Sequence, residues 1–189
     1  MIETADPRVD RSRRAVLDAT VALIGEVGIE SLTIGAISRR SGVAKTTIYR
    51  HWDGKVPLVV DALDELAGPV EAPDTGAFDD DLRALARGLA AGLAGGPWAD
   101  ALPSLVGAIR RDPDLAARHR ALTAARHEAV ATVVERGRRR GEVGVGVSVG
   151  EVVALVAGPL FYRTLIDGRP PDTVFVDRVV DHVVTLVAS

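Results

Sequence analysis

The spacing of apolar residues is the feature of this sequence that most restricts its fold. Apolar side chains recur at helical intervals in segments such as 10–27, where Val16, Ala19, Leu23 and Val27 share one face. Strict alternation is confined to the stretch VGVGVSV, whose glycines make a poor strand. The sequence therefore predicts an all-α fold, with helices over residues 10–27, 34–41, 44–51, 53–67, 78–95, 97–111, 113–140, 148–167 and 172–187.

Composition excludes several classes of protein. The chain has 189 residues and no cysteine, which rules out disulfides, thiolate metal sites and cysteine nucleophiles. No stretch approaches the roughly eighteen uninterrupted apolar residues of a transmembrane helix. The opening segment MIETADPRVDRSRR lacks the apolar core of a signal peptide. We therefore expect a cytoplasmic protein without a membrane partner.

Charge is distributed unevenly along the chain. The net charge is −3, but residues 1–55 carry +2 and the remaining residues carry −5. The only two lysines, Lys45 and Lys55, both lie in the window SGVAKTTIYRHWDGK at 41–55. This asymmetry predicts a small basic module, which we place at 1–54, on an acidic body at 55–189.

Residues 33–51 have the outline of a helix-turn-helix. Thr33 can cap the first helix, Gly42 can end it, and the second helix begins about three residues later. Asp53 is the expected N-cap of the helix that follows. The inner seam of the motif is expected to consist of four apolar residues: Ile34, Ile37, Val43 and Ile48.

The other face of the second helix then points to solvent. It carries Lys45, Thr46, Thr47 and Arg50, which are residue types that bond base edges in the major groove. Tyr49, His51 and Lys55 lie where this helix meets its flank and are suited to phosphates. Both lysines would therefore release counterions when DNA binds.

The stretch GVAKTTIYRHWDGK, preceded by a helix ending in EVG, resembles the N-terminal domain of TetR-type (tetracycline-repressor-like) transcriptional regulators. The resemblance covers about residues 10–65. It implies a three-helix DNA-binding head and a variable helical body whose last two helices form a homodimer. It also implies that Thr33, Tyr49, His51 and Lys55 hold phosphates, whereas Lys45, Thr46, Thr47 and Arg50 face bases.

Two positions depart from the family pattern. Ala44 stands where the family often has serine, so a helix cap is missing. Gly35 lies inside the first helix of the motif, at a cost of about 1 kcal/mol relative to alanine. Both departures bear on affinity rather than on the fold.

The body is predicted to supply a dimer interface and a ligand pocket. A four-helix interface is expected from apolar residues at helical spacing in the last two helices: Val152, Val156, Leu160, Val176, Val180, Val183 and Leu186. A mainly hydrophobic small molecule is expected among residues 78–140, with its polar or anionic group held by Arg126 or His127. The full predicted lining is Trp98, Leu105, Ile109, Arg126, His127, Phe161 and Tyr162.

Three further patterns have competing interpretations. GVSVG at 146–150 matches the G-x-S-x-G turn of hydrolases, but no buried strand precedes it, and Ser148 with Glu151 forms a capping box. RGRRR at 136–140 is either a second nucleic-acid patch or a cationic helix end favoured by the helix dipole, and we prefer the latter. His119 and His127 lack a carboxylate that would complete a metal site.

The sequence therefore predicts a homodimeric repressor that binds a palindromic operator in double-stranded DNA and is released by a small-molecule effector. We expect no enzymatic activity, no cofactor and no metal. The alternatives are a small helical serine hydrolase using Ser148 and a constitutive DNA-binding protein without a ligand.

Overall fold

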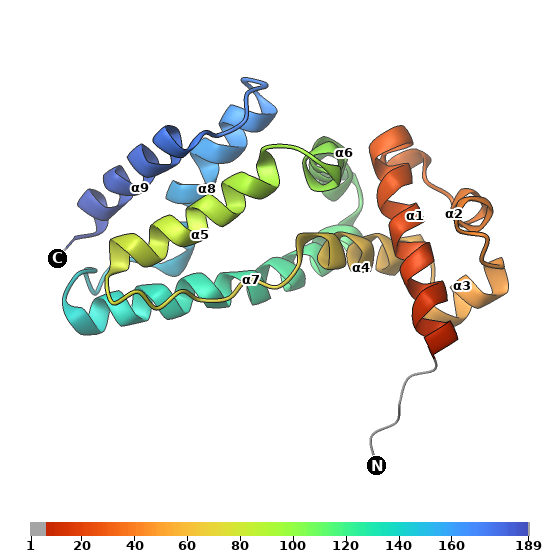
Figure 1. The fold of residues 1–189 in the computed structure, drawn as a ribbon, viewed down its shortest axis with the longest axis horizontal. Helices are drawn as coiled ribbons and strands as arrows, with labels where there is room; N and C mark the ends of the chain where they lie inside the picture. Colours follow the sequence, from red (N-terminus) through yellow and green to blue (C-terminus); the bar gives the residue numbers. More distant parts are fainter. Residues whose placement is uncertain (1–6, 189) are drawn as a thin grey trace, which may run out of the picture. The chain divides into compact units, whose positions relative to one another are not determined.

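The computed structural model describes residues 7–188, and all regular secondary structure in that range is α-helical (Figure 1). Residues 1–6, part of the opening segment that lacks the apolar core of a signal peptide, lie outside the described residues. Each predicted helix is present, and no helix in the described range is both long and apolar enough to cross a bilayer. The helices are α1 (Pro7–Ser31), α2 (Ile34–Ser41), α3 (Lys45–His51), α4 (Lys55–Ala67), α5 (Phe78–Leu93), α6 (Pro97–Arg111), α7 (Pro113–Arg140), α8 (Val149–Leu165) and α9 (Thr173–Val187).

The chain divides into two compact units. The first comprises the residues up to Gly68 together with Asp100–Arg120, and the second comprises Pro69–Ala99 together with the residues from Ala121 onward. This division by packing differs from the functional division predicted at residue 54, because α4 packs against α1. The segment 69–77, which connects α4 to α5, contains no helix.

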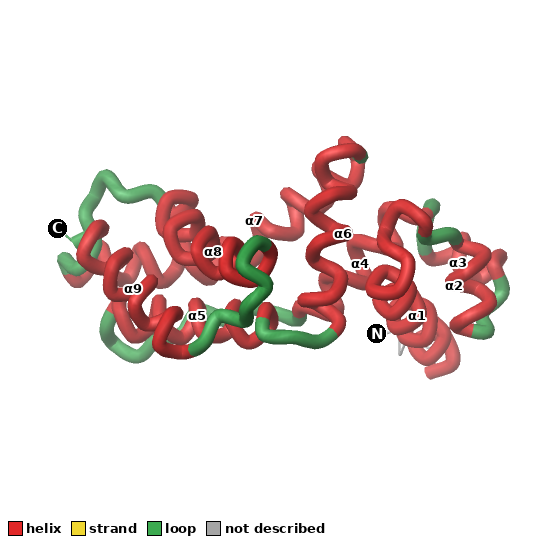
Figure 2. Tube along the Cα trace, turned by 90° about the horizontal axis from the view of Figure 1, so that it is seen from above, coloured by secondary structure: helices red, strands yellow, loops and turns green. Residues whose placement is uncertain are grey.

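In the first unit, α1 packs against α2, α3 and α4 (Figure 2). The buried side chains come from all four helices: Val16, Leu17, Ile24, Ile37, Ile48, Leu58 and Leu63. The N-cap of α4 is Gly54, with a φ of 103° and no capping side chain, so the prediction of Asp53 as the cap is wrong. The left-handed backbone at Gly54 starts α4 one residue later than a cap at Asp53 requires.

Helix α1 continues beyond its predicted end at residue 27, with a kink at Gly28. Gly28 has a φ of 77° and a ψ of 164°, and the chain continues through one more turn to Ser31. The N–H of Ile29 donates to the hydroxyl of Ser104 on α6 at 2.7 Å. The backbone angle favours glycine, and a Cβ at position 28 would also lie only 3.1 Å from the Ser104 oxygen, which would have to shift slightly.

In the second unit, α5 packs against α8 and α9, which also pack against each other. Its core has few aromatic side chains and consists mainly of Leu, Ala and Val, as the 4% aromatic content requires. The buried residues include Phe78, Leu82, Ala86, Leu93, Val133, Val134, Val152, Leu160, Val176 and Val180.

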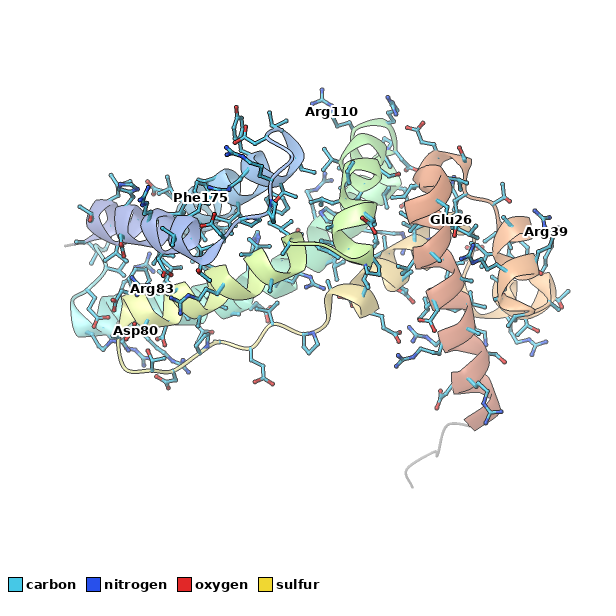
Figure 3. The ribbon with its side chains drawn as sticks, turned by 45° about the horizontal axis from the view of Figure 1, so that its top comes forward. Glu26, Arg39, Asp80, Arg83, Arg110 and Phe175 are labelled. Carbon is cyan, nitrogen blue, oxygen red and sulfur yellow. The ribbon has the colours of Figure 1, made fainter. Side chains whose placement is uncertain are left out.

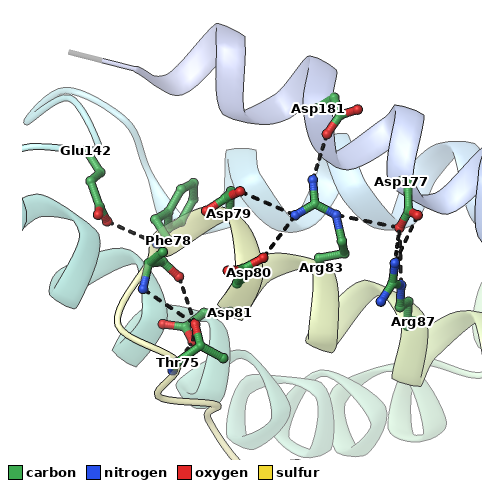
Figure 4. Close-up of polar contacts among 11 residues, drawn as sticks. Thr75, Phe78, Asp79, Asp80, Asp81, Arg83, Arg87, Glu142, Asp177 and Asp181 are labelled. Carbon is green, nitrogen blue, oxygen red and sulfur yellow. Dashed lines mark hydrogen bonds and ion pairs between the residues drawn. The ribbon is translucent and has the colours of Figure 1, made fainter.

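A polar network surrounds the start of α5 (Figure 4). The guanidinium of Arg83 lies 2.7 Å from the carboxylate of Asp181 on α9, and it also pairs with Asp79, Asp80 and Asp177. Asp81 is fully buried, and its Oδ1 accepts hydrogen bonds from the backbone N–H and the hydroxyl of Thr75, at 2.7 and 2.8 Å. These contacts join α9 and the segment before α5 to the first turn of α5.

Candidate nucleic-acid interface

The ends of α2 are fixed by local hydrogen bonds. The hydroxyl of Thr33 accepts the N–H of Ala36 at 3.1 Å, which confirms Thr33 as the N-cap. Gly42 follows α2 with a φ of 71°, and its N–H donates to Ser38 O at 3.1 Å. The short helix of the motif therefore has a defined beginning and end, because its terminal polar groups are satisfied.

The turn from α2 to α3 is also held by hydrogen bonds. The hydroxyl of Ser38 donates to the carbonyl of Val43 at 2.7 Å, and the N–H of Val43 donates to the hydroxyl of Ser41 at 3.2 Å. Ala44 is the N-cap of α3 and supplies no capping side chain, as the sequence predicts. The geometry of the turn therefore depends on α2 and not on a cap of α3.

The inner seam of the helix-turn-helix is buried as predicted. Ile37 and Ile48 are fully buried and Ile34 is almost so, whereas Val43 is half-buried. Because α3 has only seven residues, the burial of Ile48 decides which side of the helix faces outward. The outward side carries five exposed residues: Lys45, Thr46, Tyr49, Arg50 and His51. Thr47, also predicted to contact a base, is half-buried.

Trp52 fixes the end of α3, a role that the sequence pattern did not reveal. The side chain is buried, and its indole N–H donates to the carboxylate of Asp61 on α4 at 2.9 Å. The guanidinium of Arg13 on α1 lies 5.9 Å from the Trp52 ring and pairs with Asp61 at 3.5 Å. The residue that directly follows α3 is thus bound to both α1 and α4, which sets the direction of α3.

Lys55 differs from the other residues predicted to contact phosphates. Its ammonium donates to the carbonyl of Ile29 at 3.1 Å and to that of Glu30 at 3.3 Å, at the end of α1. It borders a cavity of about 90 Å³ within the first unit, whose lining also includes Val59 and Leu115. Two of its three N–H donors are therefore used inside the protein, and the sequence could not show this because the carbonyls lie 26 and 25 residues away.

The cations near α3 divide into paired and unpaired groups. Arg40 forms an ion pair with Glu26 of α1 at 2.7 Å. Arg39, Lys45 and Arg50 are exposed, and none of them has an acidic partner within residues 7–188. Figure 3 shows Arg39 on the outer side of α2; Glu26, the partner of Arg40, lies on α1. The surface of α2 and α3 is therefore positively charged where it is exposed.

The predicted ligand-pocket residues are divided between the two units. Leu105 is buried in the first unit and Ile109 is half-buried there. The other five belong to the second unit: Trp98, Arg126, His127, Phe161 and Tyr162. Tyr162 is 59% exposed, and the cavity near Lys55 is lined by none of the seven. The spacing of these residues in the sequence could not show to which of the two units each residue belongs.

Six of the residues predicted at the dimer interface are buried within the chain itself. Val152, Val156, Leu160, Val176, Val180 and Val183 are all less than 9% exposed, and they join α8 and α9 to the core of the second unit. The assignment is corrected, because side chains already covered by their own chain cannot form the main contact with a second one. Leu186, in contrast, is 69% exposed.

Ser148 is the N-cap of α8. Its hydroxyl accepts the N–H of Glu151 at 3.1 Å, which confirms the interpretation as a cap. The segment before Ser148 is the end of α7 followed by a turn, and not the strand that a hydrolase nucleophile turn requires. Within the described residues, no cluster of three or more His, Asp or Glu side chains is arranged to hold a metal ion.

Two family models match this chain. The model for bacterial regulatory proteins of the tetR family matches residues 16–62, which include α2, α3 and most of α1 and α4. The model for the tetracyclin repressor-like C-terminal domain matches residues 72–183. The two models together cover most of the sequence, and the first contains the whole helix-turn-helix.

Similar proteins extend over nearly the same length. The uncharacterized HTH-type transcriptional regulator YdeS of Bacillus subtilis (strain 168) is 30% identical over 164 residues, which are 86% of this chain and 82% of YdeS. The HTH-type transcriptional regulator AqdR of Rhodococcus erythropolis is 32% identical over 157 residues, or 82% and 75% of the two chains. The solved structure of the TetR family transcription regulator SCO0332 has a TM-score of 0.71 at 32% identity and covers 94% of this chain and 99% of its own.

Proposed function

Because this chain belongs to the TetR family of DNA-binding transcriptional regulators, we propose that it is a homodimeric repressor released from its operator by a small molecule. It acts in the cytoplasm, on double-stranded DNA, and uses neither a cofactor nor catalysis. The observation that carries the proposal is the exposed, cationic side of α3, fixed in direction by buried Ile48 and by the Trp52–Asp61 hydrogen bond.

The contacts to DNA divide by position on the motif. Lys45, Thr46, Thr47 and Arg50 reach base edges in the major groove, where lysine and arginine bond guanine and threonine contacts the thymine methyl. Three residues at the edges of the motif hold phosphates: Thr33, Tyr49 and His51. Lys55 contributes little to binding, because its ammonium already donates to two carbonyls of α1.

Selection of bound fragments from random duplex DNA tests sequence-specific binding. The wild type is expected to enrich one palindromic sequence, and Arg50→Ala is expected to lose about 1–3 kcal/mol of discrimination at particular base pairs. Arg110→Ala is the matched control, because Arg110 is an exposed arginine of the same unit on α6 (Figure 3). Equal enrichment by the wild type and Arg50→Ala would contradict the assignment of α3 as the reading helix.

The dimer uses the exposed sides of α8 and α9 in place of the buried valines. Exposed positions recur every four residues on α8 and its end (Gly150, Ala154, Gly158, Tyr162 and Ile166) and on α9 (Val174, Arg178, His182 and Leu186). A Cβ added at either glycine would meet nothing within 4 Å, so the space beside α8 is open to a second helix. Small side chains allow two helices to approach closely, and a two-fold pairing of these stripes accounts for a palindromic operator.

Sedimentation of two alanine variants tests this interface. Ala154→Glu places a charge in the middle of the α8 stripe and is expected to yield monomers at micromolar concentration. Ala117→Glu makes the same change at an exposed alanine of α7 and should leave the dimer intact. A wild type that sediments as a monomer, or an Ala154→Glu variant that remains dimeric, would rule out this face.

The effector is a mainly hydrophobic molecule with one polar or anionic group. Its site is narrowed to the half-buried residues of the second unit, where Trp98 and Phe161 supply apolar surface and Arg126 or His127 holds the polar group. A shift from 99% DNA-competent protein to 1% requires a differential affinity of about 5.5 kcal/mol, summed over the dimer.

Titration of the operator complex with lipophilic acids and their neutral esters tests the effector proposal. Acids are expected to release the DNA at lower concentration than esters, and Trp98→Ala and His127→Ala should raise the midpoint of release. If release occurs with unchanged midpoints in both variants, the site lies elsewhere. If no compound releases the DNA, the constitutive DNA-binding alternative is favoured.

A further inference from the structure

The cavity of about 90 Å³ in the first unit lies where the end of α1, the start of α4, the end of α6 and the start of α7 meet. All of its lining residues belong to the first unit, so it is separate from the effector site proposed in the second. Its wall combines aliphatic and charged side chains. The aliphatic ones are Ile29, Val56, Val59, Ala108 and Leu115, and the charged ones are Glu30, Lys55, Arg111 and Asp112.

The two acidic residues of the wall are already satisfied by the protein. Glu30 forms an ion pair with the guanidinium of Arg111. Asp112 precedes α7, and its Oδ1 accepts the N–H groups of Asp114 and Leu115 at 3.0 and 3.1 Å. The positive end of the helix dipole also stabilises a carboxylate at this position. A positively charged ligand would therefore compete with contacts that the wall already makes.

Lys55 is the cation of the wall that lacks a carboxylate partner. Its ammonium donates to the carbonyls of Ile29 and Glu30 at 3.1 and 3.3 Å, and no carboxylate within residues 7–188 pairs with it. Because carbonyl oxygens have no net charge, the positive charge of the ammonium is not neutralised, and its third N–H is left for another acceptor. An ionised acceptor forms the stronger hydrogen bond with such a donor.

We propose that this cavity binds a short-chain aliphatic monocarboxylate. The carboxylate accepts the third N–H of Lys55, and the aliphatic tail contacts Val59, Ala108 and Leu115, which are all at most 4% exposed. An apolar cavity of about 150 Å³ holds the six carbons of benzene, so 90 Å³ takes a tail of about three or four carbons. Butyrate has a tail of this length. The site does not depend on the DNA-binding function, because the ligand contacts none of the residues assigned to DNA.

Calorimetric titration of the full chain with butyrate, butyramide and butylamine tests the site without changing the protein. Butyrate is expected to bind once per chain, with a Kd on the order of a millimolar, and to raise the melting temperature. Butyramide has the same tail without the charge and should bind about tenfold more weakly, and butylamine should not bind. Equal affinity for butyrate and butyramide, tighter binding of butylamine, or no binding of butyrate would each overturn the proposal.

Two matched variants locate the ligand. Ala108→Leu fills the cavity from α6 and should weaken butyrate binding by about tenfold or more, whereas Ala117→Leu makes the same change at an exposed position of α7 and should not. Lys55→Met should abolish the preference for butyrate over butyramide, and thermal unfolding without ligand shows whether each variant is folded. His127→Ala, in the second unit, should bind butyrate as the wild type does. Wild-type affinity in Ala108→Leu, or lost affinity in His127→Ala, would mean that butyrate binds elsewhere and would overturn the proposal.

Discussion

Three exposed cations on α2 and α3 of the first unit and several arginines of the second unit differ in their pairing with carboxylates. On α2 and α3 of the first unit, Arg39, Lys45 and Arg50 have no acidic partner in the described range. In the second unit, Arg87 pairs with Asp177 at 2.9 Å (Figure 4). Arg163 pairs with Asp172 at 2.7 Å and lies over the ring of Phe175 at 4.3 Å. These two arginines of the second unit join helices, whereas the three cations on the outer side of the helix-turn-helix have no acidic partner within residues 7–188.

The difference indicates which cations are available to a polyanion. A cation that is bound to a carboxylate must lose that partner before it can bind a phosphate. A cation without a carboxylate partner can bind a phosphate directly. Most arginines in the run 136–140 are accordingly held by the chain, since Arg136, Arg138 and Arg140 contact Asp74, Glu135 and Glu142. The run 136–140 is therefore mainly a set of structural cations, whereas the exposed cations of α2 and α3 can bind a polyanion without losing a carboxylate partner.

Arg83 is the clearest case of a structural cation. Burial by itself lowers the pKa of its guanidinium, but the hydrogen bonds and charges of Asp181 and Asp79 more than offset this, so the pKa is raised above its ordinary value. A raised pKa in the folded state means that the charged form stabilises the fold below the ordinary pKa of arginine. This contribution is therefore complete at neutral pH and is lost only as the pH rises into strong alkali.

The largest effect is expected from breaking the support of the DNA-binding surface. Ile37→Ala should lower the free energy of unfolding by about 2–5 kcal/mol, because Ile37 is fully buried between α2 and its neighbours. Arg39→Ala, two residues away, should change it by less than about 0.5 kcal/mol. Urea unfolding of both variants measures the difference, and comparable losses would mean that the cationic surface also has a structural role.

The next effect concerns the structural cation of the second unit. Arg83→Met should lower the free energy of unfolding by about 1.5–3 kcal/mol, because four aspartates lose a shared partner. Operator sequence preference should be unchanged. Asp80→Asn removes only one exposed partner and should cost much less; a larger loss in Asp80→Asn than in Arg83→Met would contradict the central position of Arg83.

A substitution of Lys55 tests whether the hydrogen bonds of its ammonium, and not its place beside α3 in the sequence, decide whether it contacts DNA. Lys55→Met should lower the free energy of unfolding by about 1–2 kcal/mol, because two carbonyls at the end of α1 lose their donor. The salt dependence of DNA binding should stay close to that of the wild type. A salt slope reduced by about one, with unchanged stability, would restore Lys55 as a phosphate contact.

The smallest effect compares one N-cap from each unit. Thr33→Ala and Ser148→Ala should each cost about 1 kcal/mol of stability, because each hydroxyl accepts one N–H of the following helix at 3.1 Å. Only Thr33→Ala should also weaken DNA binding. Thermal unfolding measures the stability of the two variants, and titration with operator DNA measures their affinity. Equal effects on affinity would show that Thr33 influences DNA binding only through stability.

Local signals in the sequence were sufficient to locate the helices and the helix-turn-helix. Thr33 and Ser148 cap the helices they precede, and Gly42 adopts the left-handed backbone that ends α2. These features depend on residues within about four positions of each other, so a single sequence contains all the information they need. The burial of Ile37 and Ile48 follows in the same way, from helical spacing over two short helices.

The tertiary structure alone decided which of several possible neighbours each residue contacts. Spacing identified the apolar stripes of α8 and α9, but only packing showed that Val152 and Val180 are fully buried in the core of the second unit, where α5, α8 and α9 pack together. Composition identified Lys45 and Lys55 as a pair, yet folding places one ammonium over Gly35 and the other on the carbonyls of α1. The physical reason is that helical periodicity fixes the direction of a side chain relative to its own axis, whereas its partner depends on how distant helices pack.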